Sequence, residues 1–217
     1  MIPRKAVLVA GAFAVLSLGG CISLFPKSKP AELYRFGVGA DGVASTASTP
    51  ARSYNVSRAT TVFNRAALGD RMLTVTGAQT AYIKDARWVA PASILFDEAL
   101  VRAFEAAPGC ARLLTRGDPS IPQAILRVDV RTFEARYLEG VEAAPTAVVE
   151  AHVSMINSRD RTVLEDRLVR AERRATDNRV GAIVEALDGA NAKVLEEITA
   201  GANRRAASQG CGRNPPR

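Results

Sequence analysis

The stretch that decides the fold is AVVEAHVSMINSRDRTVLEDRLVR, residues 147–170. In its first half, small or apolar side chains at every second position alternate with a set that includes Glu150 and His152. A period of two is typical of a β-strand that packs one face and leaves the other in water. Residues 162–170 alternate in the same way, and the turn-forming run at 157–160 predicts that the two strands form a hairpin.

A third strand precedes this hairpin. At residues 124–132, apolar side chains alternate with Arg127, Asp129 and Arg131. The three strands together predict an antiparallel meander with one apolar face and one charged face.

Four shorter segments are also expected to be strands: residues 33–37, 52–56, 72–76 and 81–84. The last two would form a hairpin through Gly77. Residues 37–51, GVGADGVASTASTPA, are rich in Gly, Ser, Thr and Ala and can bury little, so they predict a flexible loop.

Two segments change to helical spacing. Residues 91–107 place Phe96 and Leu100 on one face and most charged residues elsewhere. A second helix is expected to begin near Asp177 or Asn178, either of which is a good N-cap. Because both apolar stripes need cover, the predicted fold class is α+β, an antiparallel β-sheet with two long helices packed on one face.

The first 21 residues indicate the compartment. Arg4 and Lys5 precede an apolar run, residues 6–18, which is shorter than the roughly 20 residues of a transmembrane helix and is typical of a secretory signal. The run ends in Leu18-Gly19-Gly20-Cys21, which resembles the lipobox of bacterial lipoproteins. The resemblance implies cleavage before Cys21 and acylation of its thiol. The alternative is an ordinary signal peptide, after which Cys21 stays a thiol.

The chain is therefore expected to have four parts: a lipoprotein signal peptide (1–20), a lipid anchor and flexible tether (21–32), one α+β domain (33–200), and a basic flexible tail (201–217). The tail would be loose unless Cys211 pins it. Ile22 stands where lipoproteins retained in the inner membrane often carry Asp. The expected location is thus the periplasmic face of the bacterial outer membrane.

The chain carries 29 basic and 22 acidic residues, a formal net charge of +7. Because an export signal precedes the domain, nucleic acid is not expected as a partner. Anionic lipid head groups or an acidic protein face are the expected counterparts of the positive charge, unless it only provides a soluble surface.

The three cysteines have different expected fates. With Cys21 acylated, Cys110 and Cys211 remain as an even pair in an oxidising compartment, which predicts a disulfide. The alternative is two unpaired thiols, one buried and one in the tail.

No catalytic residue and no metal site is predicted. The sequence has no nucleophile elbow, phosphate loop, dinucleotide fingerprint or Cys-x-x-Cys spacing. His152, the single histidine, is expected on the wet face of its strand with no positioned nucleophile. The chain is therefore not expected to be an enzyme or to use a cofactor, apart from the covalent lipid on Cys21.

The stretch YIKDARWVAP, residues 82–91, holds the single tryptophan just before the first helix. Two interpretations of it stay open. Trp88 could anchor the core under the start of the helix, or Tyr82, Arg87 and Trp88 could contact a partner chain, since Trp and Arg are frequent in interface hot spots.

These features together resemble the ABC-type transport auxiliary lipoprotein family. The resemblance rests on the Leu-Gly-Gly-Cys motif, on Tyr34-Arg35-Phe36, and on Tyr82…Arg87-Trp88-x-x-Pro91 leading into an amphipathic helix, and it covers roughly residues 21–200. It implies a non-enzymatic outer-membrane lipoprotein that assists an MCE-family protein and an ABC transporter in moving phospholipids or similar molecules. The loop at 37–51 and the pair Cys110 and Cys211 depart from the family pattern.

Other functions stay open at this point. One is a chaperone or pilotin lipoprotein for an outer-membrane β-barrel or secretin, and another is a hydrolase with an unrecognised site. A free lipid carrier would need a closed apolar cavity between sheet and helices, whereas an adaptor would have a filled core. Exposed strand edges would also allow a homo-oligomer.

Overall fold

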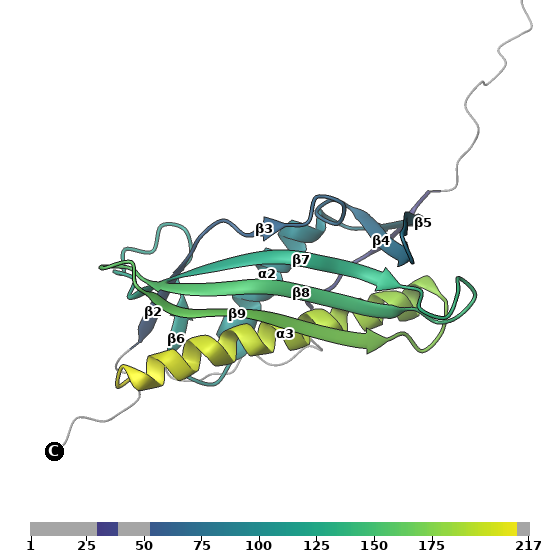
Figure 1. The fold of residues 1–217 in the computed structure, drawn as a ribbon. Helices are drawn as coiled ribbons and strands as arrows, with labels where there is room; N and C mark the ends of the chain where they lie inside the picture. Colours follow the sequence, from purple (N-terminus) through teal and green to yellow (C-terminus); the bar gives the residue numbers. More distant parts are fainter. Residues whose placement is uncertain (1–29, 39–52, 212–217) are drawn as a thin grey trace, which may run out of the picture. The chain divides into compact units, whose positions relative to one another are not determined.

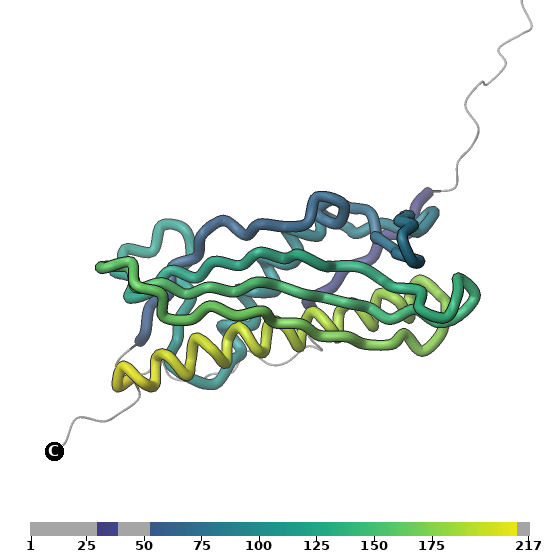
Figure 2. Tube along the Cα trace, viewed as in Figure 1, coloured from purple at the N-terminus to yellow at the C-terminus, as the bar shows by residue number. Residues whose placement is uncertain are grey.

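The computed structural model describes residues 30–38 and 53–211 (Figure 1). The expected signal peptide, Cys21, most of the tether and most of the loop at 37–51 lie outside these residues. From Ala31 onward the described chain forms one unit, in which a β-sheet carries two helices on one side (Figures 1 and 2). The fold class is thus α+β, as predicted.

Three long strands form the predicted meander. They are β7 (Ala124–Arg136), β8 (Thr146–Asn157) and β9 (Val163–Arg174), and both pairings, β7 with β8 and β8 with β9, are antiparallel. A shift of register between Val130 and Thr132 changes which side chains of β7 point inward. As a result Phe133 is buried, although the simple alternation of the sequence assigns that face to Thr132.

The prediction of a purely antiparallel sheet is wrong, because the sheet is mixed. Three short strands pair one after another, in parallel, with the other edge of β7: β2 (Tyr54–Arg58), β3 (Val62–Phe63) and β4 (Arg71–Thr76). Two further pairs are parallel: β6 (Ala111–Leu113) with β2, and β1 (Glu32–Tyr34) with β5 (Gln79–Trp88). The chain passes through a helix before β6 and β7, and such a crossover returns the chain in the same direction.

The predicted hairpin at residues 72–84 is confirmed as antiparallel β4 and β5. The strand β5 is longer than expected and reaches Trp88. Between the pairs Arg71↔Arg87 and Leu73↔Tyr82, extra residues of β5 form a bulge that contains Asp85 at φ 55°. The bulge sets the orientation of the strand end that carries Trp88.

Both predicted helices are present. The helix α2 (Ala92–Ala106) has Pro91 at its N-cap and buries Phe96, Leu100 and Phe104. The helix α3 (Val180–Ser208) packs on β8 and β9 and also contacts α2. The expected flexible tail from residue 201 is wrong for its first part, because residues 201–208 continue α3, where Ala202 and Ala206 are fully buried.

One hydrophobic core joins the sheet and the two helices. Its centre is an aromatic cluster whose ring centroids lie 5.0–6.2 Å apart in edge or tilted contacts: Phe36, Phe63, Trp88, Phe96 and Phe133. These side chains come from five separate segments, so the cluster fixes the edge strands and α2 on the meander.

Candidate functional site

The residues predicted to contact a partner do not share one environment. Trp88 has only 2% of its surface exposed and packs edge-to-face on Phe36, with the ring centroids 5.0 Å apart. The hypothesis that Trp88 contacts a partner directly is therefore wrong, and the alternative of a core anchor is the one found. The buried indole holds β5 against the first described segment.

Tyr82 and Arg87 lie on the surface. The Tyr82 hydroxyl donates a hydrogen bond to the carbonyl of Ala66 at 3.0 Å, and the guanidinium of Arg71 lies 5.2 Å from the centroid of its ring. Arg87 is paired with Asp70 at 3.2 Å. Both side chains therefore serve local contacts while staying partly exposed.

The segment after β1 is held in place by the helices. The backbone N–H of Gly37 donates to Asp188 Oδ1 at 2.7 Å, and Arg102 Nε donates to the Gly37 carbonyl at 2.9 Å. Gly37 has φ 72°, and a Cβ there would lie 2.4 Å from the Cβ of Ala99. Only glycine suits this position, which brings Phe36 onto Trp88.

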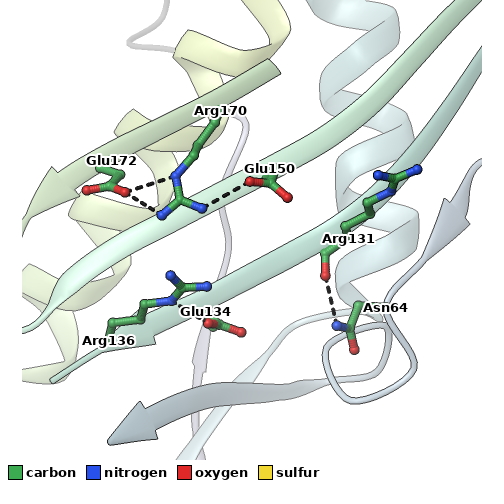
Figure 3. A network of polar contacts seen from close by, with 7 residues as sticks. All are labelled: Asn64, Arg131, Glu134, Arg136, Glu150, Arg170 and Glu172. Atoms are coloured by element: carbon green, nitrogen blue, oxygen red, sulfur yellow. Dashed lines mark hydrogen bonds and ion pairs between the residues drawn. The ribbon is translucent and has the colours of Figure 1, made fainter. Parts of the chain in front are cut away.

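The most extensive polar feature is the solvent face of the meander, here called the charged sheet face. Its members alternate in sign along and across the strands: Arg127, Asp129, Arg131, Glu134, Arg136, Glu150, His152, Asp166, Arg170 and Glu172. Figure 3 shows its centre, where Arg170 of β9 lies between Glu172 of the same strand and Glu150 of β8. Arg170 Nε donates to Glu172 at 2.9 Å, and Nη1 donates to Glu150 at 3.0 Å.

The two carboxylates raise the pKa of Arg170, chiefly through the hydrogen bond to Glu172 and then through the one to Glu150. Arg136 donates to Glu134 at 2.6 Å on β7, and the carbonyl of Arg131 accepts from the Asn64 side chain at 2.8 Å (Figure 3). These contacts hold the long side chains in fixed positions. The charged sheet face therefore presents an ordered pattern rather than a diffuse layer of charge.

His152 belongs to this face. Its Nε2 lies 2.6 Å from Asp166 Oδ1. Within residues 53–211, that carboxylate is the only side chain to which the ring is hydrogen-bonded; the hydroxyl of Ser154 lines the same pocket but is not hydrogen-bonded to the ring. The arrangement is a histidine–carboxylate contact on the surface, without the hydrogen bond from a nucleophile to its base that covalent catalysis uses.

The two remaining cysteines are joined. A disulfide links Cys110, just before β6, to Cys211, just after α3, with Sγ–Sγ 2.07 Å and Cα–Cα 6.3 Å. Asn203 of α3 reinforces the contact, because its Oδ1 accepts the backbone N–H of Ala111 at 2.9 Å. The end of α3 is thus attached to the edge of the sheet. The sequence predicts a loose tail unless Cys211 pins it, and this bond does so.

An open groove of about 760 Å³ lies between parts of α2 and α3, and alanine is the residue type that lines it most often. Asn191 lies at this groove with none of its surface exposed, and neither polar atom of its side chain has a hydrogen-bond partner among the described residues. The space between the helices and the sheet, in contrast, is occupied by the core.

In the part of the chain that the structure describes, no cluster of three or more His, Cys, Asp and Glu side chains could hold a metal ion. Neither α2 nor α3 combines the length and the apolar character needed to cross a membrane.

Sequence reasoning located the strands that carry the charged sheet face but missed its pairing. The only signal was the recurrence of opposite charges two residues apart, as at Asp129 and Arg131 or Arg170 and Glu172. The cross-strand bond of Arg170 to Glu150 depends on the register of β8 and β9, which the alternation alone does not fix.

The fold and its surfaces place the protein in the class of α+β domains that have a filled hydrophobic core, a mixed sheet and a charged solvent face. The chain belongs to the family of the ABC-type transport auxiliary lipoprotein component, whose family model matches residues 44–199. This is a family of transport accessory lipoproteins and not an enzyme family. No curated protein matches the chain.

Solved structures show the same fold. The protein XCC0632 from Xanthomonas campestris, described as family model DUF330, is 22% identical, with a TM-score of 0.69 over 82% of this chain and 99% of that one. An uncharacterised protein is 13% identical, with a TM-score of 0.61 over 79% of this chain and 98% of that one.

Proposed function

We propose that this protein is an outer-membrane lipoprotein that docks an MCE-type lipid transport system through its charged sheet face. The observation that carries the proposal is the network of ion pairs around Arg170, in a chain that belongs to the transport auxiliary family. The filled core beneath it supports an adaptor rather than a carrier.

Physical reasons favour this face as the docking surface. Electrostatic complementarity contributes to specificity and to the rate of association more than to raw affinity. Because Glu150, Arg170 and Glu172 already hold one another, little side-chain entropy remains to be lost when a partner binds. Arg127 makes no ion pair with a described residue and is exposed farther along the same face, in register with Ser154 of β8, so it is free to meet an acidic group.

The proposed location follows from the N-terminus. Acylated Cys21 would anchor the chain, and residues 21–32 would carry the domain away from the bilayer on the periplasmic side. The disulfide between Cys110 and Cys211 supports an oxidising compartment, since such bonds persist there. The partners would be an MCE-family protein and ABC transporter components, and the cargo a phospholipid-type molecule.

The test is co-purification of the tagged full-length chain, expressed with an MCE-family protein and transporter components of its own cell. The wild type should recover the transport components. Arg127→Glu should recover several-fold less, because it reverses a charge on the docking face without breaking an internal pair.

The matched control is Arg204→Glu, which makes the same charge change at an exposed position on α3. Equal losses for Arg127→Glu and Arg204→Glu would contradict docking through the sheet. Recovery of a β-barrel or secretin in place of transport components would indicate a chaperone instead.

A further inference from the structure

A polar pocket of about 380 Å³ lies at the end of the domain where the disulfide ties α3 to the sheet. It is formed by the start of β2, the residue before β7, the turn between β8 and β9, and the end of α3. The polar side chains on its wall are Ser53, Tyr54, Gln123, Asn157, Arg159, Arg205 and Gln209.

The charge of this pocket is one-sided. Arg159 and Arg205 bring two guanidinium groups, and no carboxylate is among the described residues that line it. Neither arginine forms an ion pair with another described residue, whereas fourteen such pairs occur elsewhere in residues 53–211. In addition, Nε of Arg205 is buried and has no hydrogen-bond partner. A partly buried guanidinium that no carboxylate neutralises favours an anionic ligand.

The amide side chains add donors rather than acceptors. Gln123 Oε1 accepts the backbone N–H of Asn55 at 2.6 Å, and Asn157 Oδ1 accepts the backbone N–H of Arg159 at 2.9 Å. Because both oxygens are engaged by backbone donors, each side chain has its NH₂ group left to donate. The donors of the pocket therefore outnumber its acceptors.

We infer that this pocket binds a phosphate oxyanion, with Arg159 and Arg205 as its charged contacts and Gln123 and Asn157 as neutral donors. A planar guanidinium can bind two oxygens of one phosphate group, which gives the site its preference for tetrahedral oxyanions. The same chemistry is present in free phosphate and in the head group of an anionic phospholipid. The inference does not depend on the proposed docking role, which uses the other face of the sheet.

Two features of the site bear on this assignment. The C-terminus of α3 carries a partial negative charge of about half a unit, which opposes an anion. Two full positive charges outweigh it, and the last carbonyls of α3 already accept the N–H groups of Gln209, Gly210 and Cys211.

Burial raises the pKa of Tyr54, although a hydrogen bond from Arg205 acts in the opposite direction. Tyr54 therefore stays neutral and does not compete for the guanidinium as an anion.

The test is isothermal titration of the full-length chain in non-ionic detergent micelles. One arm uses inorganic phosphate and the other uses dihexanoyl phosphatidic acid below its micellar concentration. The expected result is saturable binding of one or both ligands. Arg205→Gln and Arg159→Gln should each weaken it about tenfold, the usual effect of losing one charge-assisted hydrogen bond.

The matched control is Arg204→Gln, the same change one residue away on α3 and outside this pocket. It should bind like the wild type. Arg159 is exposed in a turn, so its variant keeps the test valid even where Arg205→Gln disturbs the fold.

Binding of phosphate alone supports the site with free phosphate as its ligand, and binding of the lipid analogue alone supports it with a lipid head group. Binding of both ligands supports the site with the shared phosphate group as the recognised feature. Absence of binding in both arms overturns the inference. It is also overturned if Arg204→Gln weakens binding as much as Arg159→Gln, because only general positive charge would then be at work. Loss of the site would leave the transporter co-purification unchanged, so the two proposals fail separately.

Discussion

At the scale of single residues, Trp88 and Phe36 show that two short motifs, separated by about fifty residues, form one packing site. The parallel pairing of Tyr34 with Trp88 brings them together, and Gly37 allows the chain to pass close to α2. The sequence indicated both motifs but not their contact, because nothing in either stretch specifies its neighbour in space.

We expect Trp88→Ala to lower the free energy of unfolding by about 3–5 kcal/mol, since it leaves a cavity within the aromatic cluster. Urea unfolding followed by far-ultraviolet circular dichroism measures the change. Tyr82→Ala, which alters a half-exposed ring on the same strand, should cost about 1 kcal/mol or less. Similar losses for both variants would contradict the buried position of the indole.

At Asn191 we expect a substitution to raise the free energy of unfolding rather than to lower it. Its amide is fully buried with neither polar atom bonded among the described residues, so the desolvation of the group is uncompensated. We expect Asn191→Leu, which keeps the same branched arrangement of four side-chain heavy atoms and has the adjoining groove to receive its larger methyl groups, to raise the free energy of unfolding by about 1–2 kcal/mol.

The matched control is Asn203→Leu on the same helix, where the side-chain oxygen accepts the N–H of Ala111. That variant should be destabilised, because it leaves a backbone donor without its partner. A loss of stability in Asn191→Leu comparable to that in Asn203→Leu would show that the Asn191 amide has a partner in solution.

At the scale of elements, the sequence predicted best the strands and helices that have one wet and one buried face. The alternation in β7, β8 and β9 and the stripe of α2 are of this kind. Strand direction was not predictable for the short strands, since side chains point alternately to the two faces of a strand whichever way its neighbour runs. The strand β6 was missed because three residues are too few to show a period.

The end of α3 was underestimated for a different reason. Residues 201–208 are polar and basic in composition, yet Ala202 and Ala206 recur at helical spacing and are buried. Small side chains contribute weakly to a hydropathy pattern, so their burial depends on the close approach of the sheet. The disulfide to Cys110 then holds the last turn in place.

Removing this disulfide should therefore lower the stability of the whole domain and loosen the end of α3 in particular. We expect the double variant Cys110→Ala and Cys211→Ala to lose about 3–4 kcal/mol, because the bond closes a loop with a sequence separation of 101. Amide hydrogen exchange at residues 201–211 should rise more than in the strands of the meander. Exchange there that is unchanged from the oxidised wild type would show that packing alone fixes the helix end.

At the scale of the whole molecule, the candidate surfaces depend on elements that the chain brings together from distant positions. The pocket near the disulfide uses residues from 53 to 211, and the charged sheet face uses three strands in one register. Composition predicted a basic surface, but it did not distinguish paired arginines such as Arg170 from unpaired ones such as Arg205. Pairing is a property of the tertiary fold.

Anchoring is the property of the whole molecule on which the proposed function depends. If Cys21 carries the lipid, Cys21→Ser should abolish labelling by a fatty-acid analogue and release the protein from the outer-membrane fraction, because each buried methylene contributes about 0.8 kcal/mol to membrane attachment. The domain should fold as before, with the same unfolding midpoint and the same disulfide, since Cys110 and Cys211 form the pair without it. Cys110→Ala combined with Cys211→Ala is the control, and it should keep both labelling and membrane attachment. Retention of the Ser variant in the outer-membrane fraction would mean that a partner or a protein surface, rather than the lipid, holds the domain there.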